Sequence, residues 1–283
     1  MNISGGMRQP GCWVPEVPAR EAQTHDGWIE YLADYHDAHP GITEDVLAGA
    51  LDIDGCSPYE WLVEAIPAAS STVVDLACGS GPVSRLLTRR RVAGSRVVGV
   101  DQSAGELDRA RSATPSGLLV RARATALPLV TGSADAVVVS MALMLLPPLE
   151  AVLAEAARLL RPGGTLAATV PLRSTAPGLP KGSAFFEILD VLGQGATDYP
   201  ETLDADGLAE RFSASGLTLG HDDTGLFTRT VVAPDDADRV VRSFYAPGTE
   251  AARVTEAVAL FRRRVEAAPV RVGYRIRRLV AVR

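Results

Sequence analysis

The segment VVDLACGSGP at positions 73–82 constrains the fold of this chain more than any other part of its sequence. Its first half is short, apolar and rich in β-branched residues, as in a buried strand. Gly79 and Gly81 then let the backbone turn sharply and approach a ligand closely. A helix pattern follows at once, so the positive end of its dipole points at the turn. The segment therefore predicts a strand, a turn with a ligand site, and a helix.

An acidic residue supports a ligand at this turn. Asp101 lies twenty positions beyond Gly81, directly after the strand-like run RVVGV at 96–100. A carboxylate at this place accepts hydrogen bonds from the two hydroxyls of a ribose in nucleoside-binding βαβ units. The dinucleotide pattern G-x-G-x-x-G is not completed, because Ser84 holds its last position. A nucleoside site is thus favoured over a turn whose glycines serve folding alone.

Strand and helix patterns alternate between positions 73 and 170, which predicts a parallel sheet with helices on both faces. A capping box of Ser57 and Glu60 begins one of three helices before the sheet, and a second box, Ser103 with Glu106, follows Asp101. After position 171 the pattern becomes less regular. The expected elements are helices at 25–39, 43–51 (capped by Thr43), 58 onward, 83–90, 103 onward, 149–160, 184–192, 204–214, 236–244 and 250–265, and strands or extended segments at 73–77, 96–101, 118–121, 136–140, 165–170, 217–220, 226–232 and 270–282.

Composition narrows the classes of function. The net charge of −6 at pH 7 gives no basic surface for a nucleic acid. The longest apolar run, at 136–146, is too short to span a bilayer, and the N-terminus has no signal pattern. The three cysteines are odd in number and lack metal-ligand spacing, which indicates a reducing compartment and no metal site. We expect a cytoplasmic protein with a small-molecule substrate and no nucleic-acid or membrane partner.

Taken in order, the motifs resemble those of class I S-adenosylmethionine-dependent methyltransferases, in particular the UbiE-like enzymes that act on small molecules. The resemblance rests on D-x-x-x-G-x-G from position 75, VGVDQS at 98–103, ALP at 126–128, ADAVVVS at 134–140 and LAEAARLLRPGG at 153–164. It implies an α/β fold with a doubly wound, mostly parallel seven-stranded sheet, an antiparallel last strand and an N-terminal helical lid. The implied organisation is a tail and lid at 1–56 and a methyltransferase-like domain at 57–283, with a substrate-side insertion at 174–216 around Lys181.

The resemblance also implies a cofactor and the residues that hold it. The cofactor is S-adenosylmethionine, and the implied reaction is methyl transfer to a small molecule, expected in bacterial secondary metabolism. Asp101 then holds the ribose hydroxyls, Gln102 lies beside the adenine, and Ser140 and Met141 line the floor under the sulfonium. The implied cofactor-binding residues are Asp75, Ala77, Gly79, Gly81, Asp101, Gln102, Arg123, Ala124, Ser140 and Met141.

One position departs from the family pattern. Relatives usually carry an aspartate that accepts a hydrogen bond from the adenine amino group, whereas this chain has Arg123, whose guanidinium has donors but no acceptor. In one interpretation Arg123 points into solvent and the backbone of Ala124 contacts the adenine. In the other, Arg123 binds an anion together with Arg85 or Arg121. The second interpretation leads to an alternative function, a cofactor-independent elimination or ring closure on an anionic substrate.

The candidate catalytic residues are His36 and Tyr35. They lie with Tyr31 and His39 on the first expected helix, which in relatives folds over the cofactor. Imidazole titrates near neutrality and can serve as a base where the acceptor carries a proton. The competing interpretation is that these aromatic side chains only pack the lid against the domain. A third hypothesis is a non-catalytic subunit, so a homodimer or a partner chain remains an open expectation.

Overall fold

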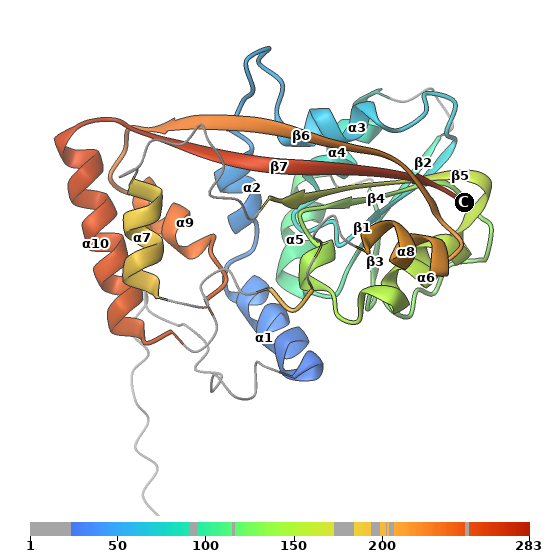
Figure 1. Ribbon diagram of the computed structural model, residues 1–283, viewed down its shortest axis with the longest axis horizontal. Helices are drawn as coiled ribbons and strands as arrows, with labels where there is room; N and C mark the ends of the chain where they lie inside the picture. The colour runs from blue at the N-terminus through green and yellow to red at the C-terminus, as the bar shows by residue number, and fades with distance from the viewer. Residues whose placement is uncertain are drawn as a thin grey trace, which may run out of the picture.

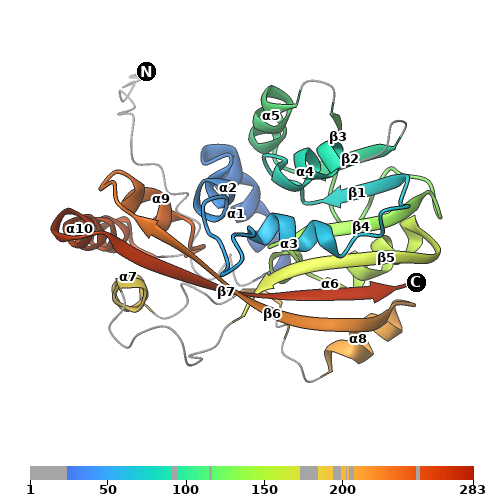
Figure 2. The same ribbon diagram turned by 90° about the horizontal axis from the view of Figure 1, so that it is seen from above.

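The computed structural model describes residues 24–90, 95–114, 117–172, 184–193, 199–201, 203, 207–246 and 249–283. Its strands are β1 (Thr72–Leu76), β2 (Arg96–Asp101), β3 (Leu118–Arg121), β4 (Ala134–Ser140), β5 (Leu160–Pro171), β6 (Thr218–Val231) and β7 (Val270–Val282). They form one sheet in the order β3-β2-β1-β4-β5-β7-β6, which Figure 2 shows from above. The strands β1 to β5 pair in parallel, and β7 runs antiparallel to both β5 and β6. The predicted fold class is confirmed.

Helices cover both faces of the sheet (Figure 1). Neighbouring residues of a strand point to opposite faces, so Val73 packs with the helices on one side and Val74 with those on the other. A strand that is buried on both faces is apolar along its centre, which explains the apolar run at 136–139 within β4. The helices are α1 (His25–Ala38), α2 (Ile42–Leu47), α3 (Pro58–Glu64), α4 (Pro82–Arg90), α5 (Ala104–Ala113), α6 (Leu149–Leu159), α7 (Ala184–Leu192), α8 (Leu208–Ala214), α9 (Asp236–Arg242) and α10 (Ala251–Ala267), with a single 3-10 turn at Leu143–Leu145.

A second packing unit lies at the far ends of β6 and β7, where α7, α9 and α10 gather (Figure 1). We call it the outboard region. Its core is separate from that under the sheet and is built around Phe261, which is fully buried. The helices α1 and α2 lie between the outboard region and the sheet, with α2 against α9 and α1 against α5. The buried residues of the outboard core are Ile188, Leu192, Val231, Ala237, Val240, Val241, Ala246, Val254, Ala257, Phe261, Val265 and Val272.

Several boundaries differ from the predictions for local reasons. The second helix begins at Ile42 and is not capped by Thr43, because Gly41 adopts a left-handed φ of 79° and starts the helix earlier. The segments expected at 217–220 and 226–232 form one strand, because β6 pairs with β7 along its whole length. Residues 161–164, between the helix expected at 149–160 and the strand expected at 165–170, belong to β5, and Gly163 N–H donates to the carbonyl of Arg283 at 2.8 Å.

Other predictions are confirmed or lie outside the described residues. The capping box of Ser57 and Glu60 forms in full at the start of α3, with proline at the first helical position. The last strand has the predicted bounds. Residues 1–23, 173–183 with Lys181, and 204–206 at the start of the helix expected at 204–214 lie outside the described part of the chain. Within that part, no helix combines the length and the apolar character needed to cross a bilayer.

Candidate active site

The glycine turn joins β1 to α4 at the carboxyl edge of the sheet. Cys78 N–H donates to the carbonyl of Val100 at 3.0 Å, which ties the turn to β2. The backbone is left-handed at Ala77, Gly79 and Gly81, with φ of 55°, 52° and 83°. This conformation is readily accessible to glycine, whereas it costs a residue with a Cβ, such as Ala77, about 1–2 kcal/mol. The predicted strand–turn–helix unit is present, with a strained alanine at its entrance.

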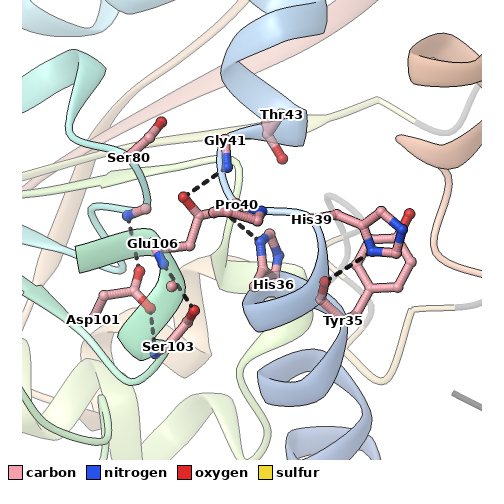
Figure 3. Close-up of polar contacts among 12 residues, drawn as sticks. Tyr35, His36, His39, Pro40, Gly41, Thr43, Ser80, Asp101, Ser103 and Glu106 are labelled. Carbon is pink, nitrogen blue, oxygen red and sulfur yellow. Dashed lines mark hydrogen bonds and ion pairs between the residues drawn. The ribbon is translucent and has the colours of Figure 1, made fainter. Parts of the chain in front are cut away.

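Asp101 holds the turn from the end of β2. Its Oδ2 accepts a hydrogen bond from Gly79 N–H at 2.8 Å, and its Oδ1 accepts one from Ser103 N–H at 2.9 Å (Figure 3). Burial raises the pKa of Asp101, and the backbone hydrogen bonds from Ser103 and Gly79 oppose the rise. Each carboxylate oxygen has a second lone pair, so Asp101 can still accept hydrogen bonds from two hydroxyls.

A cavity of about 110 Å³ opens over the turn, where the carboxyl ends of β1, β2 and β4 meet. Ligand sites in open α/β sheets lie at this edge. Most of the residues proposed from the sequence line the cavity, whereas Asp75, Gly81, Arg123 and Tyr35 do not. Thr43, Glu106 and Tyr245 also line it, and the sequence did not single them out as site residues. The proposed residues that line it are His36, Ala77, Gly79, Asp101, Gln102, Ala124, Ser140 and Met141.

His36 connects the lid to the cavity through both of its ring nitrogens. Its Nδ1 lies 2.8 Å from Oε1 of Glu106, and its Nε2 lies 3.1 Å from the hydroxyl of Tyr245. The second oxygen of Glu106 accepts a hydrogen bond from Gly41 N–H at 2.9 Å (Figure 3). A carboxylate only accepts, so we assign the proton of the neutral imidazole to Nδ1, and Nε2 then accepts from Tyr245.

Glu106 corrects the expectation of a second capping box. Ser103 does cap α5, since its hydroxyl accepts from Glu106 N–H at 3.1 Å. The carboxylate of Glu106, however, does not return to Ser103 N–H, which already donates to Asp101. It turns instead to His36 and Gly41, where it is buried with only 2 % of its surface exposed. The tertiary contact with the lid outweighs the local capping pattern because two donors there need an acceptor.

Tyr35 lies outside the cavity and holds α1 against the outboard region. Its hydroxyl donates to the carbonyl of Arg242, and its ring stacks on His39 with centroids 4.7 Å apart. Burial is the largest effect on the pKa of Tyr35 and raises it. The structure therefore places Tyr35 in a packing position, in line with the competing interpretation of this helix, and brings Tyr245 to the cavity instead.

Asp75 lies beneath the turn and is fully buried. Its Oδ2 accepts a hydrogen bond from Ser84 Oγ at 2.7 Å, and its Oδ1 has no hydrogen-bond partner among the described residues. Burial raises the pKa of Asp75 to about 7, against the lowering effect of Ser84. Asp75 thus fixes the start of α4 under the turn and does not itself face the cavity.

The three arginines of the alternative function do not meet at the cavity. Arg123 is exposed, whereas its neighbour Ala124 lines the cavity. Arg85 pairs with Glu44 and donates to the carbonyl of Ser80 at 2.7 Å. Arg121 Nε donates to the carbonyl of Gln102 at 2.9 Å. Within the described part of the chain, the cavity lining includes neither lysine nor arginine, and its carboxylates are Asp101 and Glu106.

Comparisons with known proteins agree with this geometry. Residues 74–168 match the family described as a methyltransferase domain. An uncharacterized methyltransferase of Mycobacterium tuberculosis is 39% identical over 107 residues, which are 38% of this chain and 41% of the relative. The trans-aconitate 2-methyltransferase of Azoarcus sp. is 41% identical over 106 residues, 36% of this chain and 40% of the relative. The matched region thus spans about two fifths of the length of these curated relatives.

Solved structures share the fold over most of the chain. The cyclase SpnF superposes with a TM-score of 0.58 at 16% identity, over 94% of this chain and 98% of that one. A methyltransferase solved in complex with the Haloferax volcanii Trm112 activator gives a TM-score of 0.56 at 21% identity, over 88% and 96% of the two chains. Residues 74–168 therefore contain a methyltransferase domain, which agrees with the sheet order and the glycine turn described above.

Proposed function

We propose that this protein transfers a methyl group from S-adenosylmethionine to a small-molecule acceptor. The observation that carries the proposal is the charge of the cavity over the glycine turn. Asp101 and Glu106 line it, and the described lining residues include no lysine or arginine. Such a lining suits a ligand that combines a diol with positive charge. When bound, this cofactor supplies an electrophilic methyl group on its sulfonium.

The residues around the turn fit the parts of this cofactor. Asp101 keeps acceptor capacity for the ribose hydroxyls while it holds the turn in place. The backbone around Ala77 and Gly79 faces the cavity and is assigned to the amino acid end. We assign Gln102 and the backbone of Ala124 to the adenine. The remaining assignments are Ser140 and Met141, which form the floor next to the acceptor.

Residues 1–56 supply the lid in this proposal, and 57–283 the methyltransferase domain. Polar contacts join α1 to the loops around the cavity: Gln102 Nε2 donates to the carbonyl of Ile29 at 3.1 Å, and Ser103 Oγ donates to Asp37 Oδ1 at 2.6 Å. Desolvation strengthens the electrostatic interactions inside such a site. His36 faces the cavity from this lid and is proposed as the base. The segment 174–216 is proposed to complete the acceptor side.

The alternative of cofactor-independent chemistry on an anion is not proposed, because the described cavity lining includes no lysine or arginine to bind that anion. We propose instead a cytoplasmic enzyme of small-molecule biosynthesis, in line with a relative that is named for the methylation of trans-aconitate. The archaeal relative solved with its activator is a precedent for a partner chain, which size-exclusion chromatography of the purified protein tests.

Isothermal titration calorimetry with S-adenosylmethionine and with S-adenosylhomocysteine tests the proposal. We expect a single site with a dissociation constant in the micromolar range, which corresponds to about −8 kcal/mol. Circular dichroism on the same sample establishes that the protein is folded. A folded protein that binds neither compound would end the proposal.

A further inference from the structure

Four side chains from separate parts of the chain form a directed line of hydrogen bonds at the cavity wall. The hydroxyl of Thr43 lies 3.3 Å from that of Tyr245, and the Tyr245 hydroxyl lies 3.1 Å from Nε2 of His36. His36 Nδ1 lies 2.8 Å from Glu106, which ends the line. Because the carboxylate can only accept, the protons point one way, from Thr43 through Tyr245 and His36 to Glu106.

The direction of these hydrogen bonds allows the four side chains to accept a proton from a ligand in the cavity. A carboxylate on Nδ1 of an imidazole fixes the tautomer and stabilises the imidazolium that forms when Nε2 takes a proton. Glu106 is held by Gly41 N–H, and its acidic neighbour Asp101 faces the same cavity. His36, Glu106 and Tyr245 all line the cavity, so the imidazole and the phenol are accessible to a ligand there. The matched domain at 74–168 includes Glu106 but neither His36 nor Tyr245.

We propose, resting on the proposed methyl transfer, that Tyr245 and His36 take the proton of the acceptor and that Glu106 is the positioning residue for this step. Tyr245 contacts the nucleophile and passes its own proton to Nε2 of His36 as it receives that of the acceptor. The acceptor is therefore a molecule without negative charge whose nucleophilic atom carries a proton, and a hydroxyl compound is its simplest form.

The step balances in atoms and charge. The O–H bond of the acceptor breaks and a new bond forms between its oxygen and the methyl carbon. The electron pair of the sulfur–methyl bond stays on sulfur, and the acceptor proton ends on the relay as the His36 imidazolium. Burial raises the pKa of Tyr245, which disfavours a free phenolate, so the two proton transfers through its hydroxyl are concerted. The positive charge of the imidazolium is compensated by Glu106.

The tautomer of His36 tests the role of Glu106 without turnover. The chain has four histidines, and the H36N variant assigns the His36 signals in a nitrogen-15 spectrum of the full chain bound to S-adenosylhomocysteine. We expect wild type to hold the proton on Nδ1. In E106Q a single acceptor oxygen serves two donors, so the tautomers mix. The control D37N makes the same carboxylate-to-amide change at a residue that does not line the cavity. It weakens the contact of Asp37 with Ser103 and Gly105, and we expect it to leave the tautomer unchanged. A proton on Nε2 in wild type, or the same mixture in D37N, would overturn the assignment.

Tyr245 and the acceptor class are tested with phenol and trans-aconitate as probes, in the presence of S-adenosylmethionine. We expect methyl transfer to phenol, followed as release of S-adenosylhomocysteine, and a decrease of about 10²–10⁴-fold in Y245F. Tyr35 is the matched control because its hydroxyl binds a backbone carbonyl outside the cavity, so Y35F stays within about twofold of wild type. Transfer to trans-aconitate and not to phenol, or equal rates in Y245F and wild type, would overturn the relay. Calorimetry with S-adenosylhomocysteine separates these outcomes from a failure of the proposed function. A Y245F protein that binds this compound as wild type does has kept the cofactor site, whereas a wild-type protein that does not bind it ends the proposed function itself.

Discussion

The two parts of this molecule reach the cavity in different ways. Around the glycine turn, each role follows from one βαβ unit: the turn needs left-handed residues, and Asp101 at the end of β2 accepts a hydrogen bond from Gly79 N–H. The outboard region has no motif, and its core joins residues between 188 and 272. The loop after α9 leads from this region to Tyr245, which packs in the core under the sheet and meets His36 across 209 positions of the sequence. In our proposal, local turn chemistry therefore determines the part of the cavity assigned to the cofactor, whereas tertiary packing determines the part assigned to the acceptor.

Helices α1 and α2 link the glycine-turn side of the molecule to the outboard region. Helix α2 packs against α9 of the outboard region, and α1 packs against α5 of the cofactor side. Asp45 on α2 pairs with Arg109 on α5 at 2.5 Å, and Arg229 of β6 donates to the carbonyl of Asp45 at 2.8 Å. Changes in the outboard region are therefore expected to act on the acceptor end through α1 and α2, and changes in the turn to act on the cofactor directly.

The largest expected effect is at the cofactor end. In D101A the cavity loses the carboxylate proposed for the ribose diol, and charge-assisted hydrogen bonds contribute about 1.5–3 kcal/mol each. Two of them correspond to about 3–6 kcal/mol, or a decrease in affinity for S-adenosylhomocysteine of about 10²–10⁴-fold by calorimetry. If a folded D101A protein bound S-adenosylhomocysteine with unchanged affinity, the glycine turn and Asp101 would not be the cofactor site.

The outboard core gives the contrasting case. Phe261 is fully buried there, so F261A is expected to lower the free energy of unfolding by about 3–5 kcal/mol in urea titrations. The affinity of F261A for S-adenosylhomocysteine should stay within about twofold of wild type, because none of the residues proposed to hold the cofactor belongs to this core. A parallel loss of affinity would show that the two parts are not separable. L153A in the core under the sheet is the matched control, with a cost of about 2–5 kcal/mol.

Asp75 predicts an unusual pH dependence for the turn. Its pKa in the folded protein is about 7, above the value of about 3.9 in an unfolded chain. Between these values only the folded state keeps the proton, so stability from this group falls as pH rises and is lowest above pH 7. D75N removes this effect and keeps an oxygen for Ser84. We expect the stability of D75N relative to wild type to increase by on the order of 4 kcal/mol from pH 4 to pH 8, measured by urea unfolding without ligand. A difference that does not depend on pH would contradict the burial argument.

Arg123 is expected to have the smallest effect. Its side chain is exposed and lies outside the cavity lining, so R123A should change the affinity for S-adenosylhomocysteine by less than about 0.5 kcal/mol. The same holds for R123D, which restores the acidic residue usual in relatives without placing it in the cavity. A tenfold gain or loss of affinity for S-adenosylhomocysteine in either variant would show that Arg123 does contribute to the adenine pocket.

The features that could be predicted from the sequence are those that depend on residues within one strand, turn or helix start. The sheet elements, the capping box at Ser57 and the placement of Asp101 follow from apolar runs, turn residues and hydrogen-bonding side chains close in sequence. Glu106 was assigned to a capping box because it fits that local pattern, and only its contacts with α1 and Gly41 show its other role. Tyr245 carries no local signal at all. Its place depends on tertiary contacts with α1 and with the core under the sheet, which periodicity does not encode.

A crystal structure of the protein with S-adenosylhomocysteine tests the central claim most directly. We predict the ribose hydroxyls within hydrogen-bond distance of Asp101, while Asp101 keeps its bond to Gly79 N–H. The account is contradicted if the nucleoside lies elsewhere, or if Asp101 faces only the backbone and the diol binds another side chain.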